Sequence, residues 1–234
     1  NNKKNKKIVK KNSGTWSVNG RSALYLILNK IKKKGINHIH LPSFICSSVL
    51  QPIKKLKLNY SFYPVDENLN IEPDNNSSNS ALLLIHYFGK VNKISKSFQI
   101  NSNTKINLIE DATHVFLNKN FNLNNINSSI FFSLRKFAPV MMGGWCNIKQ
   151  KVSQPNAVVD NIALKLLSAK LLKTLYLKDK KSAFNQKTEN YYLKLFNECE
   201  AKMNKNIMAT DIPKFVKKTI NKINWQFVLE KRRK

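Results

Sequence analysis

Residues 81–85 read Ala-Leu-Leu-Leu-Ile, an apolar run without the alternation of apolar and polar positions typical of a half-exposed strand. A strand that is apolar on both faces suits a parallel sheet, because helices cover both faces of such a sheet. Short apolar or β-branched runs recur on either side of it, at residues 38–41, 60–63, 106–109 and 129–132. The sequence therefore predicts a mostly parallel sheet built from the first half of the chain.

Helical segments alternate with these strands. Apolar residues within Ser22 to Lys34 recur at Leu24, Ile27, Leu28 and Ile31, which form one face of a helix, and Gly35 follows as a stop signal. Residues 47–58 are predicted to form a second helix. Alternation of strands and helices is the pattern of βαβ units, so we predict an α/β fold with helices flanking the sheet.

The second half of the chain has a different composition, rich in Lys, Leu and Ala and without strand signals. Its periodicity predicts helices over residues 157–178, 186–204 and 212–230. We therefore divide the sequence into an α/β domain, residues 1–150, and a helical segment, residues 151–234. Because the sequence begins without Met and ends at Lys234 inside a helical pattern, we expect it to be a fragment of a longer protein.

The charge is strongly positive, since 41 Lys and Arg residues against 13 Asp and Glu residues give +28. Arginine, which forms bidentate contacts with phosphates and bases, occurs only at positions 21, 135, 232 and 233. We find no aromatic-basic motif or nucleic-acid recognition module. The lysine excess is therefore interpreted as a compositional bias on solvated faces, and no nucleic-acid partner is expected.

Cysteine usage and hydropathy indicate a cytoplasmic protein. The three cysteines, Cys46, Cys146 and Cys199, form no CxxC pair, which argues against a disulfide framework and against a zinc site of common spacing. No apolar run reaches the roughly 18 residues that a membrane span needs, and no signal peptide follows the basic start. We expect no metal and no membrane span.

Four segments carry residues suited to chemistry: 17–24, 108–114, 131–136 and 141–145. The first is a Gly turn that leads into a helix N-terminus, which binds phosphate or simply caps the helix. In the second, a strand ends at Asp111 and is followed by His114. The carboxylate of Asp111 could bind a cation; equally, Asp111 could cap a helix and His114 could be a polar group with its hydrogen bonds satisfied. In the third, Lys136 follows a hydrophobic strand beside Arg135; it is a candidate nucleophilic amine or one of many surface lysines.

The order of these segments, together with Pro42-Ser43-Phe44, Tyr63-Pro64-Val65-Asp66 and Ile85-His86-Tyr87-Phe88-Gly89, resembles the DegT/DnrJ/StrS-type sugar aminotransferases. The resemblance covers about residues 14–150. It implies the large domain of an aspartate aminotransferase-like fold, fold type I, with pyridoxal 5'-phosphate (PLP) as cofactor. The sequence resembles a divergent branch, because Ser133-Leu134-Arg135-Lys136 and Met141-Met142-Gly143-Gly144 depart from the usual family motifs.

The resemblance also implies roles for individual residues. Lys136 matches the lysine that forms a Schiff base with PLP, and Asp111 matches the aspartate that pairs with the pyridinium nitrogen. Cys46 stands where many members have an aromatic residue that stacks on the ring. The remaining matches hold the cofactor, and they are Thr113 on the ring face, His114 at the ring hydroxyl, and Ser133, Gly20, Arg21 and Ser22 at the phosphate.

The implied activity is transfer of an amino group from an amino acid such as glutamate to a nucleotide-linked keto-sugar, in surface polysaccharide or amino-sugar biosynthesis. Lys136 favours transamination, because related PLP dehydratases carry histidine at that position. A homodimer is implied as well. The family's small domain, which closes over substrate, is expected to begin near Arg232-Arg233, where the sequence ends. The alternative is a non-catalytic or truncated relative that folds and binds PLP without turnover.

Overall fold

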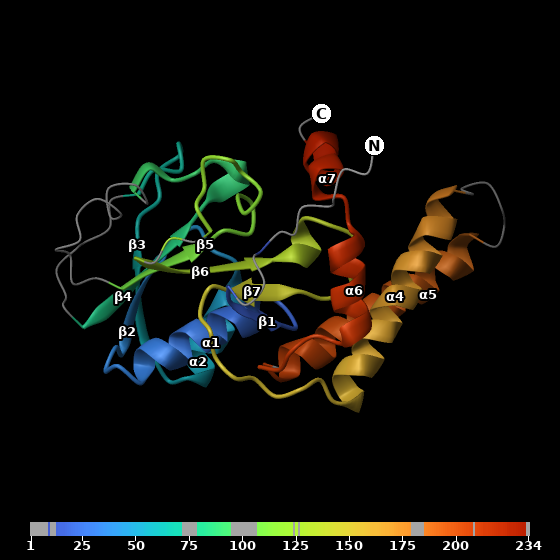
Figure 1. The fold of residues 1–234 in the computed structure, drawn as a ribbon, viewed down its shortest axis with the longest axis horizontal. Helices are drawn as coiled ribbons and strands as arrows, with labels where there is room; N and C mark the ends of the chain where they lie inside the picture. Colours follow the sequence, from blue (N-terminus) through green and yellow to red (C-terminus); the bar gives the residue numbers. More distant parts are fainter. Residues whose placement is uncertain are drawn as a thin grey trace.

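The computed structural model describes residues 9, 13–71, 79–94, 107–123, 125, 127–178, 185–207 and 209–232. Their core is a seven-stranded sheet with the strand order β1-β7-β6-β5-β4-β2-β3 (Figure 1). The strands are β1 (Thr15–Ser17), β2 (His38–Pro42), β3 (Asn59–Tyr63), β4 (Ser80–Ile85), β5 (Asn107–Asp111), β6 (Ser128–Ser133) and β7 (Gly144–Cys146).

Neighbouring strands from β3 across to β6 run parallel, and β7 pairs antiparallel with both β6 and β1. The predicted α/β class with a mostly parallel sheet is therefore confirmed. All five predicted strands are present, although Ile106 lies outside the described residues. The prediction omitted β1 and β7, because a three-residue strand is too short for a periodic pattern.

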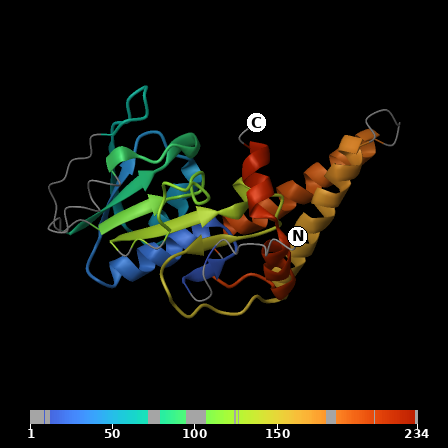
Figure 2. The same cartoon turned by 45° about the horizontal axis from the view of Figure 1, so that its top comes forward.

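Helices lie along one face of the sheet and beside the β6–β7 part of the other face (Figures 1 and 2). On one face, α1 (Gly20–Lys32) and α2 (Leu50–Lys55) share a core with Phe131 and Cys146. The opposite face of the same two strands, carrying Phe132 and Trp145, packs against the C-terminal helices. These helices are α4 (Ala157–Lys178), α5 (Asn185–Lys205), α6 (Lys214–Lys222) and α7 (Trp225–Arg232).

Two helix predictions are corrected. Residues 47–58 form a 3₁₀ turn, Ser47–Val49, followed by the short α2 rather than one helix. The single helix predicted over residues 212–230 is wrong, because Ile223 is extended and separates α6 from α7. The adjacent Asn224 side chain accepts the Phe227 N–H at 3.1 Å, and a capping asparagine favours a new helix start over helix continuation.

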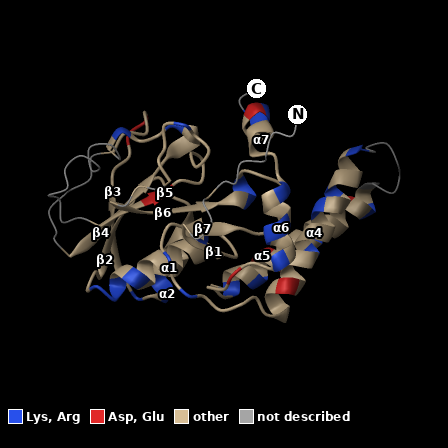
Figure 3. Ribbon diagram, in the orientation of Figure 1, with Lys and Arg blue, Asp and Glu red and all other residues tan. Residues whose placement is uncertain are grey.

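Lys and Arg positions are spread along the helices at both ends of the molecule (Figure 3). This distribution agrees with the interpretation of the lysine excess as solvated surface. In the described ranges, no helix combines the length and apolarity that crossing a membrane would require.

One close backbone approach ties β7 to the start of α1 and predicts a large loss of stability. A Cβ atom added at Gly144 would lie 2.0 Å from the carbonyl oxygen of Asn19, the residue that caps α1. Because the obstacle is backbone and not a flexible side chain, Gly144→Ala is expected to lower the free energy of unfolding by about 3 kcal/mol. Urea unfolding followed by circular dichroism measures the change.

Gly35→Ala is the matched control. Gly35 has a φ of +88° but open space around its Cβ position, so this variant isolates the cost of left-handed backbone. We expect about 1 kcal/mol there. If Gly144→Ala proves no more destabilising than Gly35→Ala, the tight contact between β7 and Asn19 is incorrect.

Candidate functional site

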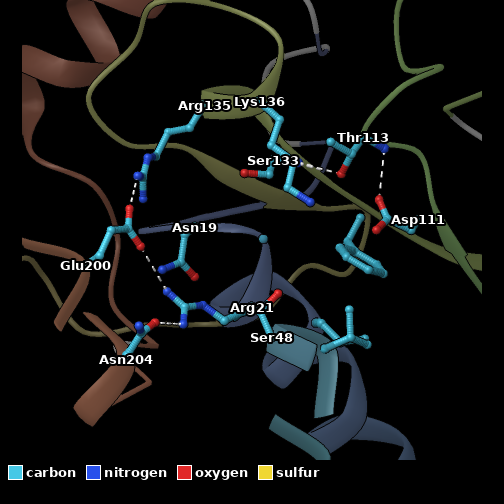
Figure 4. A pocket seen from close by; sticks show the side chains of 14 residues that line it. Asn19, Arg21, Ser48, Asp111, Thr113, Ser133, Arg135, Lys136, Glu200 and Asn204 are labelled. Atoms are coloured by element: carbon cyan, nitrogen blue, oxygen red, sulfur yellow. Dashed lines mark hydrogen bonds and ion pairs between the residues drawn. The ribbon is translucent and has the colours of Figure 1, made fainter. Parts of the chain in front are cut away.

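A pocket of about 390 Å³ opens where β5 and β6 end and α1 begins (Figure 4). The carboxyl ends of parallel strands are the usual place for a ligand crevice in an open α/β sheet. Most of the sequence-predicted site residues lie together in the lining of this pocket, namely Gly20, Arg21, Asp111, Thr113, Ser133 and Lys136. They come from separate segments of the chain, so the fold assembles them.

The first turn of α1 forms one end of the pocket. Asn19 caps the helix by accepting the backbone N–H of Ser22 at 3.0 Å. The free N–H groups and the positive dipole end of such a turn bind anions. A Cβ atom at Gly20 would lie only 3.1 Å from the Cβ of Ser133, so glycine here lets the helix start pack directly against the end of β6.

A chain of hydrogen bonds fixes the strand ends at the other side of the pocket. The backbone N–H of Thr113 donates to Oδ1 of Asp111 at 2.9 Å, and the hydroxyl of Thr113 accepts the backbone N–H of Ser133 at 3.2 Å. The second carboxylate oxygen of Asp111, Oδ2, has no hydrogen-bond partner within the part of the chain that the structure describes. Asp111 is thus oriented through one oxygen, with the other available to a ligand.

Lys136 lies in the 3₁₀ turn Leu134–Lys136 that follows β6 directly. Its side chain is exposed and points into the pocket (Figure 4). The neighbouring Arg135 turns away from it toward α5 (Figure 4). The structure therefore places an accessible amine between the helix start and Asp111.

Helix α5 closes one side of the pocket, which the sequence did not predict. Glu200 forms ion pairs with Arg135 and, at 3.7 Å, with Arg21, whose guanidinium also donates to the side chain of Asn204. Burial lowers the pKa of Arg21, while the charge of Glu200 opposes that effect. Residues 186–204 carry only a helical pattern, so nothing in the sequence distinguished Glu200 or Asn204 from other polar surface residues.

Glu110, the other acid at the end of β5, does not line the pocket. It is fully buried, within 3.1 Å of Nε2 of His86, and it accepts a hydrogen bond from the hydroxyl of Ser128. Successive side chains of a strand point to opposite faces. The pleat therefore separates the two acids, and of these two only Asp111 is available for ligand chemistry in this pocket.

Two further predicted residues and Cys46 lie beside the pocket rather than in its lining. His114 stacks on Phe88 with ring centroids 6.3 Å apart, and burial lowers its pKa. The hydroxyl of Ser22 is buried and lacks a hydrogen-bond partner among the described residues. Cys46 is exposed, and a hydrogen bond with the hydroxyl of Ser48 lowers its pKa. The roles of His114 and Ser22 stay predictions.

The family model of the DegT/DnrJ/EryC1/StrS aminotransferase family matches residues 4–126, more than half of the sequence. The chain belongs to this family. The match includes Asp111, Thr113 and the start of α1, whereas Ser133 and Lys136 lie beyond it. PLP is the cofactor that membership of this family implies. A comparison with curated proteins found no match.

Solved structures similar to the chain include 3-amino-5-hydroxybenzoic acid (AHBA) synthase, with 20% identity, 57% of this chain and 37% of that chain covered, and a TM-score of 0.48. A putative sugar aminotransferase from Streptococcus pneumoniae has 13% identity, 59% and 41% coverage, and a TM-score of 0.49. A DegT/DnrJ/EryC1/StrS aminotransferase from Brucella abortus has 18% identity, 67% and 44% coverage, and a TM-score of 0.45. The chain spans about two fifths of the length of these proteins.

Proposed function

We propose that the protein is a PLP-dependent aminotransferase that transfers an amino group from an amino-acid donor to a nucleotide-linked keto-sugar. The observation that carries this proposal is one pocket lined by Lys136, Asp111, Ser133 and the first turn of α1. An amine, a carboxylate and an anion-binding helix end are the groups that PLP chemistry draws from its protein. Family membership supports the aminotransferase class.

The residues present fit the cofactor at its phosphate end. The first turn of α1 would bind the phosphate through its backbone N–H groups, with the hydroxyl of Ser133 and the guanidinium of Arg21 beside them. Glycine at position 20 lets this turn approach Ser133 closely, since an added Cβ would lie 3.1 Å from the Cβ of Ser133. The hydroxyl of Ser22, in the same turn, is buried and has no hydrogen-bond partner among the described residues. It would be a further contact for the phosphate.

The opposite end of the pocket fits the ring. Asp111, held through Oδ1 by the backbone N–H of Thr113, would use its charge to keep a proton on the pyridine nitrogen. When bound, PLP supplies an electron sink that stabilises negative charge on the α-carbon of the donor. A carboxylate is needed for this, since a neutral side chain does not favour the protonated nitrogen to the same extent.

Lys136 would form the covalent bond to the cofactor and would transfer the proton. Its amine would hold the cofactor in the resting protein and be released when the donor amine replaces it. The freed amine would then take the proton from the α-carbon of the donor as a general base. Thr113 would support the ring face, and His114 would contact the ring hydroxyl, as the family resemblance implies.

We further propose glutamate or a similar amino acid as donor, a role in surface polysaccharide or amino-sugar biosynthesis, a homodimeric assembly and a cytoplasmic location. The donor, the pathway and the dimer follow from the resemblance in sequence, and the cytoplasmic location follows from the cysteine usage and hydropathy of the sequence. The domain division also remains part of the proposal, with residues 1–150 as the cofactor-binding large domain and residues 151–234 as a helical segment that leads to a truncated or absent small domain.

The test is formation of amino-sugar from glutamate and a panel of nucleotide-linked keto-sugars, with the matching free keto-sugars as controls. We expect this chain to bind PLP but to turn over poorly, and a chain extended by any natural C-terminal continuation to turn over many times, because covering the substrate excludes water. Efficient turnover by the 234-residue chain alone would contradict the expectation that a further part of the protein must cover the substrate. PLP binding without turnover at either length would favour the non-catalytic relative.

A further inference from the structure

Two arginines in the pocket converge on a single carboxylate. The guanidinium groups of Arg21, from the first turn of α1, and Arg135, from the turn after β6, both form ion pairs with Glu200 of α5 (Figure 4). Arg21 and Glu200 are 179 positions apart in the sequence, so the contact is a product of the fold and not of local spacing. It joins the helical segment to the α/β domain at the site itself.

The arginine pair belongs to the elements that would bind the phosphate. Arg21 follows Gly20 in the anion-binding turn of α1, and Arg135 lies two residues after Ser133, which packs against Gly20. Carboxylate and phosphate are the two groups that a guanidinium binds best, through the same planar set of donors. Glu200 thus accepts a hydrogen bond from Arg135 and forms an ion pair with Arg21, whose own hydrogen bonds go to Gln51 and Asn204, so it competes with an incoming phosphate for both guanidinium groups.

The exposure of Arg21, Arg135 and Glu200 allows a phosphate to replace the carboxylate at the two guanidinium groups. The side chains of Arg21 and Arg135 are 12% and 22% exposed, whereas that of Glu200 is 39% exposed. A half-exposed carboxylate on a helix rotates into solvent at low cost, and an exposed ion pair contributes little to stability. A phosphate with close to two negative charges therefore displaces a single carboxylate from these donors.

We propose that Glu200 is an internal competitor that sets the affinity and selectivity of the arginine pair for anions. Weakly bound anions fail to displace its carboxylate, whereas a phosphate that is anchored at the α1 N-terminus displaces the carboxylate from the two guanidinium groups. The identification of that phosphate as the PLP phosphate rests on the proposed function. The competition itself does not, because it concerns any phosphate that enters the pocket.

Binding measurements on the cofactor-free protein test the proposal, with inorganic phosphate, PLP and pyridoxal as probes. Pyridoxal has the same ring and aldehyde as PLP but no phosphate. Glu200→Gln is expected to tighten binding of inorganic phosphate and of PLP about fivefold and to leave pyridoxal unchanged. Glu198→Gln is the matched control, since Glu198 lies on the same helix but pairs with Lys165 outside the pocket.

A second variant tests the mechanism. Arg135→Gln is expected to weaken binding of inorganic phosphate and of PLP. In the Arg135→Gln background, the gain in affinity from Glu200→Gln should be smaller, because one of the two guanidinium groups for which Glu200 and phosphate compete is missing. Thermal unfolding, measured without phosphate and at increasing phosphate concentrations, provides an independent readout. Phosphate should raise the Tm of Glu200→Gln more than that of the native protein, since it replaces the lost carboxylate.

Unchanged or weaker phosphate binding in Glu200→Gln would overturn the proposal, and so would an equal gain for pyridoxal, which would indicate a structural effect. Should Glu200→Gln fold poorly, Glu200→Asp keeps the charge but shortens its reach, and a gain of smaller size in the same direction is expected. If Lys136 proves not to bind PLP covalently while Glu200→Gln still tightens inorganic phosphate, the proposed function fails and the competition stands.

Discussion

Replacing Lys136 by alanine is expected to abolish the covalent attachment of PLP to this protein. In the native chain, the amine of Lys136 points into the pocket from the turn after β6 and is accessible to the cofactor (Figure 4). Alanine removes the only atom of this residue that can form the bond, while the α1 N-terminus and Asp111 stay in place. The visible absorbance of the reconstituted protein should fall at least tenfold, with weaker, non-covalent PLP binding retained.

Lys119→Ala is the control, because Lys119 is an exposed lysine outside the pocket lining. It should leave the absorbance unchanged and thereby separates the pocket lysine from non-specific reaction of PLP with surface amines. An absorbance band of native intensity in Lys136→Ala would remove Lys136 from its proposed role.

Asp111→Asn is expected to slow the half-reaction with glutamate on the order of a hundredfold or more. Asparagine keeps the oxygen that accepts the backbone N–H of Thr113, so the strand end should hold its shape. It lacks the negative charge that would keep a proton on the pyridine nitrogen and thereby favour negative charge at the α-carbon. PLP binding should be retained in part, since the phosphate contacts lie at the other end of the pocket.

The rate is measured as conversion of the PLP absorbance to that of pyridoxamine phosphate in single-turnover experiments on the longest natural chain. Asp66→Asn serves as control, because Asp66 is an exposed loop residue that bonds with Asn70 away from the pocket. A native rate in Asp111→Asn would exclude Asp111 from the mechanism.

Residues with strong local patterns were predictable from the sequence. The run at residues 81–85 lacks polar positions because both faces of β4 are buried, and that pattern alone indicated a parallel strand. Gly20 and Asp111 were predicted as site residues from the order of the motifs, and the structure places both in the lining of one pocket.

Contacts between distant segments were not predictable in the same way. The periodicity of residues 186–204 indicates a helix but not where that helix packs, so the contact of Glu200 with Arg21 and Arg135 has no sequence signal. The break between α6 and α7 depends on Ile223, which is extended, and on the capping residue Asn224. His114 was placed in the site by motif alone, whereas its observed stacking on Phe88 depends on the loop that carries Phe88.

The most direct test of the central claim is to reconstitute the chain with PLP, reduce it with borohydride and map the modified lysine by mass spectrometry. Reduction makes the link between amine and cofactor permanent, so the labelled peptide identifies the attachment residue. We predict stoichiometric labelling of Lys136, with the many surface lysines at background. Stoichiometric labelling of another lysine, or equal low labelling across the lysines of the chain, would contradict the assignment of this pocket as the cofactor site.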